Sequence, residues 1–531
     1  MKQRLFPLWL ALAICVGVLI GRFCSPHAAR QIIGIPIASN DKLSYLLQAI
    51  RCNYVDTIDM DSIIEQALPM VLAELDPHSS YIPAEDSEES VEDLKGQFSG
   101  IGVRFVVQKD TVRVMNVVKG GPSEKVGILA GDRIVAADDS SLIAMPQRDI
   151  MRQLRGPKGT QVTLTVCRPG RADTLRFIVE RGEVPVESVD ASFMIGDHTG
   201  YIAVKSFGER TYPEMLTALV DLQVRGMSGL IIDLRGNRGG YMQTAIQMVN
   251  EFLAADQLIV YTEGCNFPRE EFRADGRGSF RQLPLCVLVD EGSASAAEIF
   301  AGAVQDNDRG TIVGRRSFGK GLVQQPIDFS DGSVVRLTVA RYYTPAGRCI
   351  QKPYVKGHGE EYENDLLERY ERGEFFSADS IHQQGPEYKT LQGRTVYGGG
   401  GIMPDIFVPE DTTLYTTYYK AAVYAGLVHQ FTLAYADRHR ADLQPLGDDV
   451  EAMVRWLQRQ DILAQFVAFA TQQGLKPQPL MLQRSAPLFL QTLYANIIYD
   501  AGDEAMRLRY YATIDPTIQR AIDVLDHPAL P

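Results

Sequence analysis

The 531-residue sequence predicts an α/β core, preceded by a small β-rich domain and followed by a mostly helical region. Between residues 200 and 325, apolar strand-like runs alternate with glycine-rich turns and helical patterns, as is typical of α/β domains. Residues 97–182 contain five short runs of strand-like alternation, and apolar residues after Asp411 recur at helical spacing. A chain of this length exceeds one ordinary core, so several domains are expected.

The composition favours a folded enzyme or binding protein over a disordered chain. Hydrophobic residues make up 45% of the sequence and charged residues 22%. The net charge of −13 argues against a general nucleic-acid binder. None of the seven cysteines forms a CxxC pair, and no His-x-x-x-His spacing occurs. We therefore expect no metal site, no cofactor and no nucleic-acid partner.

The first residues have the pattern of an export signal. Lys2 and Arg4 precede an uncharged apolar stretch from Leu5 to Gly21, which is just long enough to span a bilayer. Because the residues after it offer a poor cleavage site, residues 1–24 are expected to form an uncleaved signal anchor. A cleaved signal peptide is the alternative. Retention of the two basic residues inside predicts export of the remaining chain.

An N-terminal helical segment is expected over residues 40–90. Apolar residues recur at helical spacing until turn-forming residues interrupt them at Asp76–Pro83. The acidic run after Pro83 predicts a solvated helix start, in which Ser87 caps the helix and the carboxylates favour its N-terminus.

Residues 91–182 resemble a PDZ domain through "GILAGDRIVAADD" and the later "LRGPKGTQVTLTV". In that family, the loop before the second strand binds the terminal carboxylate of a peptide through backbone N–H groups. The matching loop here consists of Ser99, Gly100, Ile101 and Gly102. Glycines let a backbone approach an anion closely, and the adjoining strand edge can pair with an extended peptide.

The stretch "LVDEGSASAAEIFAGAVQDN" places two candidate nucleophiles, Ser293 and Ser295, between an apolar run and a helix. No histidine lies at the end of a predicted core strand, except His198 in a turn, so a Ser-His-Asp triad is not supported. Lys320, between two glycines in "SFGKG", could act as base if burial lowers its pKa. On these residues alone, two helix-capping serines and a surface lysine remain the competing interpretation.

Four motifs in order, "DLRGNRGG", "EGSASAAEIFAGAVQD", "GRRSFGKGLVQQ" and "YYTPAGR", resemble the carboxyl-terminal processing, or tail-specific, proteases. The resemblance extends from about Leu43 to Pro409 and implies a crotonase-like Ser-Lys protease core over residues 183–410. It assigns the nucleophile to Ser295 and the general base to Lys320. Gln324, one helical turn beyond the lysine, matches the glutamine that orients it.

The same resemblance implies an oxyanion hole formed by the N–H groups of Gly239 or Gly240 together with that of Ala296. Arg238 departs from the proline or glycine that is frequent in the family, but both following glycines are intact. Three further residues match positions that support the site: Glu298, Ser317 and Asp306.

The function implied is an exported serine endopeptidase that cleaves proteins near their C-termini, with the PDZ domain capturing the substrate tail. The implied location is the bacterial cell envelope, on the periplasmic side of the inner membrane, or the periplasm after cleavage. The alternatives are a membrane-tethered PDZ scaffold with an inactive core and a crotonase-like acyl-transferring enzyme. The intact candidate dyad favours the protease. Residues 411–531 carry no motif, and we expect them to serve as a homo-oligomer or adaptor surface.

Overall fold

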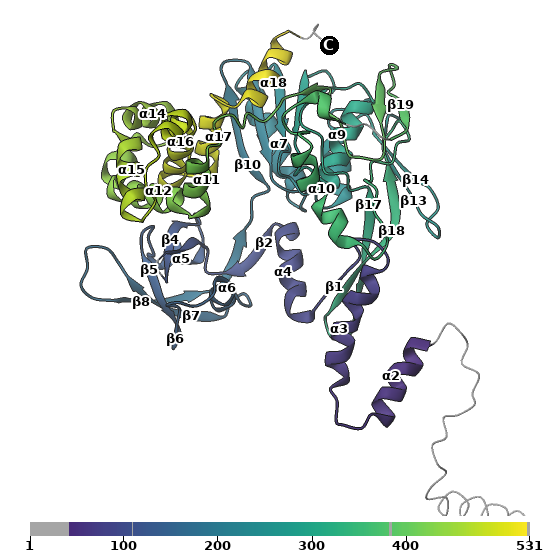
Figure 1. Cartoon of the computed structure of the whole chain (residues 1–531), viewed down its shortest axis with the longest axis horizontal. Helices are drawn as coiled ribbons and strands as arrows, with labels where there is room; N and C mark the ends of the chain where they lie inside the picture. Colours follow the sequence, from purple (N-terminus) through teal and green to yellow (C-terminus); the bar gives the residue numbers. More distant parts are fainter. Residues whose placement is uncertain (1–41, 109, 382–384, 528–531) are drawn as a thin grey trace, which may run out of the picture. The chain divides into compact units, whose positions relative to one another are not determined.

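The computed structural model describes residues 42–108, 110–381 and 385–527 (Figure 1). The expected signal anchor lies outside these residues. No helix within the described ranges is long and apolar enough to cross a membrane. The chain divides into two compact units after Met70. The first contains α2 (Lys42–Asn53) and the start of α3 (Met60–Ala73), which confirms the helical pattern predicted there.

The second unit is built on a six-stranded sheet in which all neighbours are parallel except the first pair. Every residue of its two central strands is buried, which explains their uninterrupted apolar sequences. The strands, in spatial order, are β10 (Val189–Ile195), β11 (Thr199–Val204), β12 (Gly229–Asp233), β15 (Leu285–Val289), β16 (Thr311–Gly314) and β21 (Ile406–Phe407).

Helices cover both faces of this sheet. One face packs against α7 (Thr211–Val224), α8 (Met242–Asn250) and α9 (Ala296–Asp306). The other face packs against the last two helices, α17 (Glu504–Ala512) and α18 (Pro516–Asp526) (Figure 1). The C-terminal region therefore contributes two helices to the α/β core.

The rest of the C-terminal region forms a helical bundle with its own aromatic core, including Phe431, Phe466 and Phe489. Asp437 in this bundle forms an ion pair with the buried Arg113 of the β-rich domain. The main helices of the bundle are α11 (Thr417–Tyr424), α12 (Leu427–Arg438), α14 (Val450–Gln458), α15 (Ile462–Gln472) and α16 (Pro479–Ala501).

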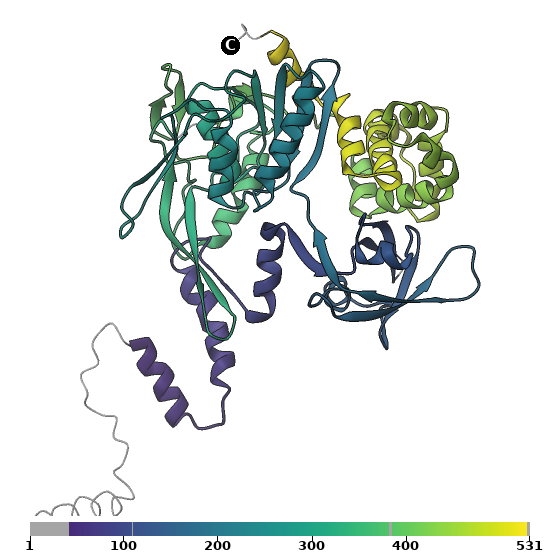
Figure 2. The same cartoon turned by 180° about the vertical axis from the view of Figure 1, so that it is seen from behind.

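A second sheet places an N-terminal strand beside the hairpin that follows Lys320. Figures 1 and 2 show two long hairpins of this sheet, β13–β14 and β17–β18. The short strand β1 pairs with β18, so the turn that precedes it lies next to this hairpin. The strands are β1 (Ser80–Ile82), β13 (Leu258–Glu263), β14 (Glu270–Arg273), β17 (Leu322–Asp328) and β18 (Val334–Tyr343).

The β-rich domain has the five predicted strands, which the two-residue β6 extends to a six-stranded sheet, and two short helices. Its edge strand is β3 (Val103–Gln108), which pairs with β4 on one side only within the described chain. The remaining elements are β4 (Thr111–Val117), β5 (Arg133–Ala137), β6 (Ser140–Ser141), β7 (Gln161–Cys167), β8 (Leu175–Glu180), α5 (Pro122–Val126) and α6 (Gln147–Leu154). Two further strands, β2 (Gln97–Gly100) and β9 (Gly182–Pro185), pair beside it.

The acidic helix α4 (Ala84–Lys95) differs from its prediction in two respects. Its N-cap is Pro83, and Ser87 lies inside the helix, where its hydroxyl donates to the Ala84 carbonyl. Its carboxylates also have partners in the β-rich domain. The ion pairs are Asp86 with Arg148, Glu85 with Arg152 and Glu92 with Arg155. The start of α4 is acidic as predicted, but these three carboxylates also pair with arginines of the α6 region and so are not simply solvated.

Candidate active site

The two candidate serines occupy different environments in the turn between β15 and α9. Ser293 is fully buried, and its hydroxyl donates to the Leu234 carbonyl at 2.7 Å and accepts from the Asp290 N–H at 3.0 Å. Ser295 is half-buried at the N-terminal end of α9, with a φ of 55°. Ser293 is therefore a turn residue, as predicted, and Ser295 is the more accessible hydroxyl.

Glu298 connects the Ser295 turn to the loop that carries Lys320. Its carboxylate is fully buried and accepts the N–H groups of Ser295 (2.8 Å), Gly319 (2.7 Å) and Lys320 (2.9 Å). The Ser317 hydroxyl donates to it as well. Burial raises the pKa of Glu298 to about 7, and these hydrogen bonds act in the opposite direction. One carboxylate thus holds the backbone of both predicted reacting residues.

The surroundings of Lys320 shift the pKa of its side chain downward. Burial lowers the pKa of its ammonium, and the nearby charge of Arg336 lowers it further, whereas Glu298 and Asp76 raise it. The Tyr342 hydroxyl is hydrogen-bonded to the carbonyl oxygens of Ser295 (3.0 Å) and Lys320. The lysine is therefore held beside the Ser295 turn in a setting that favours its neutral form.

Gln324 lies on strand β17, so the prediction of a helical turn between it and Lys320 is wrong. The segment is held extended because it pairs along its length with β18, with an irregularity between Val323 and Gln324. The Gln324 amide nitrogen lies 3.3 Å from the Thr338 hydroxyl on the partner strand.

The glycine-rich turn after β12 lies directly against Ser295. A Cβ on Gly239, whose φ is 99°, would lie 2.8 Å from both the Ala294 carbonyl oxygen and the Ser295 Cβ. The Gly239 N–H donates to the Asn237 side chain at 2.8 Å. Within the described chain, the N–H groups of Gly240 and Ala296 have no protein partner. The latter lies at a helix start, where N–H groups lack intrahelical acceptors. These two N–H groups are thus the donors that remain for an oxyanion.

The third supporting residue, Asp306, lies at the opposite end of α9 from Ser295. It forms an ion pair of 2.6 Å with Arg348, and both side chains are fully buried. It also accepts the Ala346 N–H at 3.1 Å. Asp306 therefore holds the "YYTPAGR" segment in place and does not face the reacting groups.

Several contributors to the site were not anticipated from the sequence. The His78 Nε2 atom is hydrogen-bonded to the Tyr362 hydroxyl at 2.8 Å, and the tautomer of the imidazole decides which of the two donates. Burial, and then the charge of Lys320, lowers the pKa of His78 to about 4, which shows that this imidazole lies near the lysine. The buried Arg369 donates to the carbonyl oxygens of Ser317 (3.1 Å) and Arg316 (2.8 Å).

Tyr362 and Arg369 lie on α10 (Gly359–Glu371), within residues 353–394, where the charged and aperiodic sequence predicts a surface excursion. That expectation is wrong for α10, which packs its two buried residues against the Lys320 loop. Their separation of seven residues, two helical turns, was the available signal. It was obscured by the surrounding charged residues.

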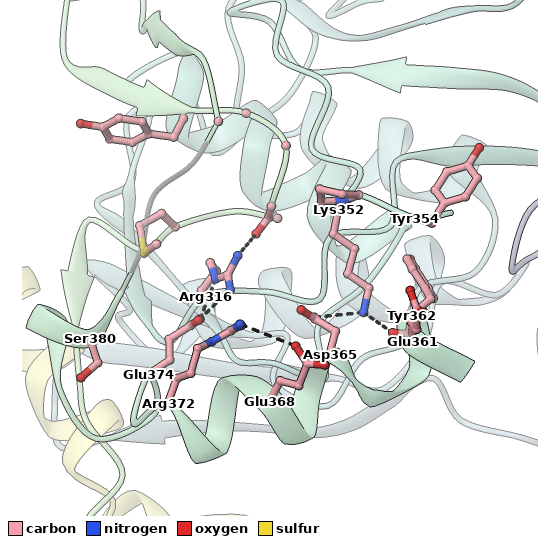
Figure 3. A pocket seen from close by; sticks show the side chains of 18 of the residues that line it. Arg316, Lys352, Tyr354, Glu361, Tyr362, Asp365, Glu368, Arg372, Glu374 and Ser380 are labelled. Atoms are coloured by element: carbon pink, nitrogen blue, oxygen red, sulfur yellow. Dashed lines mark hydrogen bonds and ion pairs between the residues drawn. The ribbon is translucent and has the colours of Figure 1, made fainter. Parts of the chain in front are cut away.

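A pocket of about 460 Å³ lies between α10 and residues 397–403 (Figure 3). Lys352 in its wall pairs with Asp365 at 3.0 Å and lies 4.0 Å from the ring centroid of Tyr362. Arg316 pairs with Glu374 at 2.6 Å. The Lys352 N–H also donates to the Gly319 carbonyl at 2.8 Å, so the pocket wall is hydrogen-bonded to the loop that carries Lys320.

The predicted carboxylate-binding loop lies between β2 and β3. Ser99 and Gly100 end β2, while Ile101 and Gly102 lead into β3, with Gly102 at a φ of 72°. The carbonyls of Ile101 and Gly102 accept N–H groups from Ser123 and Val118, each at 3.0 Å. An antiparallel bridge between Gly100 and Arg155 turns the Ile101 N–H toward the Leu154 carbonyl, whereas the Gly102 N–H has no partner in the described structure. The loop thus has a donor available beside an open strand edge. Among the described residues, no group of three or more acidic, histidine or cysteine side chains could hold a metal ion.

Three family models match parts of this chain. The model of peptidase family S41 matches residues 198–360, and that of the PDZ domain matches residues 99–190. A family of unknown function matches residues 418–503. Together with the α/β structure and its helical C-terminal region, these matches confirm the predicted fold class.

Two named relatives align over more than half of this chain. The carboxy-terminal-processing protease of Bartonella bacilliformis is 36% identical over 312 residues, which cover 58% of this chain and 71% of that protein. The carboxy-terminal processing protease CtpB of Bacillus subtilis is 33% identical over 319 residues, covering 60% and 66% respectively. A solved photosystem II D1 C-terminal processing protease is 30% identical, covers 59% of this chain and 84% of its own, and has a TM-score of 0.34.

Proposed function

The chain belongs to the carboxy-terminal-processing protease family, and on this basis we propose that Ser295 and Lys320 are its nucleophile and general base. It is a serine endopeptidase with a PDZ domain, and the inactive-scaffold alternative is not supported by its relatives. The observation that carries the assignment is the buried Glu298 carboxylate, which binds the backbone N–H groups of both residues. Such a link fixes the nucleophile and base relative to each other, as catalysis requires.

The chemistry follows from this arrangement. Neutral Lys320 accepts the proton of the Ser295 hydroxyl while Oγ attacks the carbonyl carbon of the scissile peptide. The resulting oxyanion is stabilised by the N–H groups of Gly240 and Ala296. The Lys320 ammonium then donates its proton to the leaving amine as the C–N bond breaks. Water attacks the acyl-enzyme by the same route, with Lys320 again accepting a proton, and releases the new C-terminus.

The PDZ domain supplies the proposed selection for protein tails. A terminal carboxylate would accept the N–H groups of the Ile101–Gly102 turn, of which that of Gly102 is unpaired in the described structure, while the preceding residues pair with the open edge of β3. This places Ser99, Gly100, Ile101 and Gly102 in substrate capture and Ser295 in cleavage. The substrates are therefore proteins and peptides with exposed C-terminal tails.

We also propose that the protein acts on the outer side of a bacterial inner membrane, tethered through residues 1–24. The support is the uncharged stretch Leu5–Gly21 after Lys2 and Arg4. When cells are fractionated, the full-length protein is expected in the membrane fraction. A variant without residues 1–24 is expected in the soluble fraction. Recovery of the intact chain in the soluble fraction would contradict the anchor.

The helical bundle is proposed to mediate homo-oligomer formation. Its large exposed apolar side chains include Tyr424 (85% exposed) and Leu480 (81% exposed). Replacing both by serine is expected to lower the molar mass measured by light scattering. A wild-type monomer would contradict the proposal, and so would an unchanged oligomer.

A covalent serine reagent tests the catalytic assignment directly. A fluorophosphonate is expected to modify Ser295, because this residue is only half-buried and Glu298 holds its backbone together with that of the proposed base, and to leave the buried Ser293 unmodified. Peptide mapping by mass spectrometry identifies the modified residue, with Lys320→Met as the control that should suppress labelling. Modification at Ser293, or equal labelling of the control, would overturn the assignment.

Gly239→Ala is expected to lower kcat/KM by about 10²–10³-fold, since the added Cβ would displace the oxyanion turn from Ser295. Gly236→Ala is the matched control. Gly236 also has a positive φ, 68°, but its Cβ would meet nothing within 4 Å. The control is expected to lose roughly 1–2 kcal/mol of folding stability and to retain most activity. Equal activity of the two variants would refute the close-approach explanation.

A further inference from the structure

A chain of hydrogen bonds reaches Gln324 from a distant part of the sequence. The Thr338 hydroxyl donates to the Asp76 carboxylate at 3.0 Å, across 262 residues of sequence, and lies 3.3 Å from the Gln324 amide nitrogen. Asp76 belongs to the turn before β1, Thr338 to β18 and Gln324 to β17. The three groups therefore come from adjacent elements of one sheet.

Asp76, the first residue of this hydrogen-bond chain, is held in place by several hydrogen bonds. It is 6% exposed, and its carboxylate accepts the His78 N–H (2.8 Å), the Ser79 N–H (2.9 Å) and the Ser79 hydroxyl (2.6 Å). The Thr338 N–H donates to the same Ser79 hydroxyl at 3.1 Å. The turn and β18 are thus joined by two parallel hydrogen-bond paths.

The charge on Asp76 determines which group donates and which accepts in each of these hydrogen bonds. Burial would raise the pKa of this carboxyl, but the hydrogen bonds from Ser79, His78 and Thr338 hold it below its usual value. An ionised carboxylate can only accept hydrogen bonds, so the Thr338 hydroxyl must donate its single proton to Asp76. Thr338 then has only lone pairs left for Gln324. The amide must therefore turn its NH2 group toward Thr338.

This orientation leaves the Gln324 carbonyl oxygen free to accept. A neutral lysine amine has two N–H donors and one lone pair, and it is the lone pair that removes the proton of Ser295. An acceptor beside the amine takes an N–H and leaves the lone pair available. The reversed amide would present N–H donors, which would occupy that lone pair and block the base.

We propose that Asp76 and Thr338 are positioning residues that keep the Gln324 carbonyl oxygen, and not its NH2 group, available to the Lys320 amine. The inference rests on the proposed role of Lys320 as general base and on the assignment of Gln324 as the glutamine that orients it. Asp76 is also among the charges that raise the pKa of the Lys320 ammonium. The other charged or titratable groups acting on this region are Arg336 on β18, Glu298 on α9, His78 in the same turn and Lys352.

Two substitutions of Thr338 distinguish the role of its hydroxyl from that of its branched side-chain shape. Thr338→Val keeps the branched side chain that suits a strand but removes the donor to Asp76 and the acceptor for Gln324. It is expected to lower kcat about 10–100-fold, with KM and the thermal midpoint nearly unchanged, as is typical when a residue supporting a reacting group is lost. Thr338→Ser keeps the hydroxyl and should stay within about threefold of wild type. Equal kcat in the two variants would overturn the proposal.

Asp76→Asn gives an independent readout. An amide oxygen is a weaker acceptor than a carboxylate, so the variant loosens the hold on the Thr338 proton, and it also removes a negative charge that raises the pKa of Lys320. We expect kcat to fall and the acid limb of the kcat/KM–pH profile to move to lower pH. An unchanged profile would contradict the proposal, and this variant decides the matter if Thr338→Val fails to fold.

The experiment distinguishes failure of this inference from failure of the proposed function. Wild-type protein that cleaves tail peptides and is labelled at Ser295, together with a fully active Thr338→Val variant, rejects only the hydrogen-bond chain. Wild-type protein without cleavage or labelling at Ser295 rejects the dyad itself.

Discussion

Ser295→Ala is expected to lower kcat/KM for peptide cleavage by a factor on the order of 10⁴ or more while leaving the fold and tail binding intact. Only Oγ is lost, so no step can form an acyl-enzyme. The backbone N–H at this position still donates to Glu298, and the α9 N-terminus is preserved. The measurement is cleavage of a tail peptide by mass spectrometry, with binding of the same peptide followed by calorimetry.

Ser293→Ala provides the control for this result. Its hydroxyl is buried and bonded to Leu234 and Asp290, so its loss should lower the free energy of unfolding by roughly 1–3 kcal/mol. The folded fraction should still cleave peptide and accept the serine reagent. Full cleavage by Ser295→Ala, or an inactive but stably folded Ser293→Ala, would show that the two serines have been assigned the wrong roles.

Lys320→Arg should be inactive as well, with an expected loss of about 10²–10⁴-fold, because arginine stays protonated and cannot act as a base. The substitution conserves the positive charge, so an electrostatic role of Lys320 alone would leave much of the activity. Circular dichroism and peptide binding serve as checks of the fold. Substantial cleavage by this variant would contradict general-base catalysis.

The pH profile gives the same test without replacing the lysine. The base works in its neutral form, so kcat/KM should rise with pH through a pKa that burial and Arg336 hold below 10.5. Removing the positive charge by Arg336→Gln takes away a cause of that lowering. The acid limb should therefore move to higher pH, opposite to the shift expected for Asp76→Asn. Shifts in the same direction would contradict control of the profile by Lys320.

The fold was predictable because its signals are local. Buried strands such as β12 and β15 have uninterrupted apolar sequences, and the glycine-rich turns mark the ends of parallel strands, where active sites form. The motifs placed Ser295 and Lys320 correctly in the same region of the α/β core. Their spatial relation through Glu298 was not predictable, since hydrogen bonds between distant loops leave no periodic pattern.

The remaining differences have the same cause. Gln324 lies four residues after Lys320, a spacing that corresponds to one helical turn. Pairing with β18 instead holds Gln324 in a strand. Asp76 and Thr338 lie too far apart in sequence for any local pattern to connect them. The acidic run of α4 was interpreted from its composition alone, whereas its arginine partners lie some sixty residues later.

The backbone at Ser295 restricts how this enzyme can evolve. A φ of 55° is unfavourable for any side chain branched at Cβ, because the second substituent crowds the neighbouring peptide groups. Threonine, although it keeps a hydroxyl and is reachable from serine by a single nucleotide change, would strain this turn. Cysteine has the unbranched Cβ that the turn accepts. The lineage is therefore expected to explore thiol chemistry at this position more readily than it explores a threonine nucleophile.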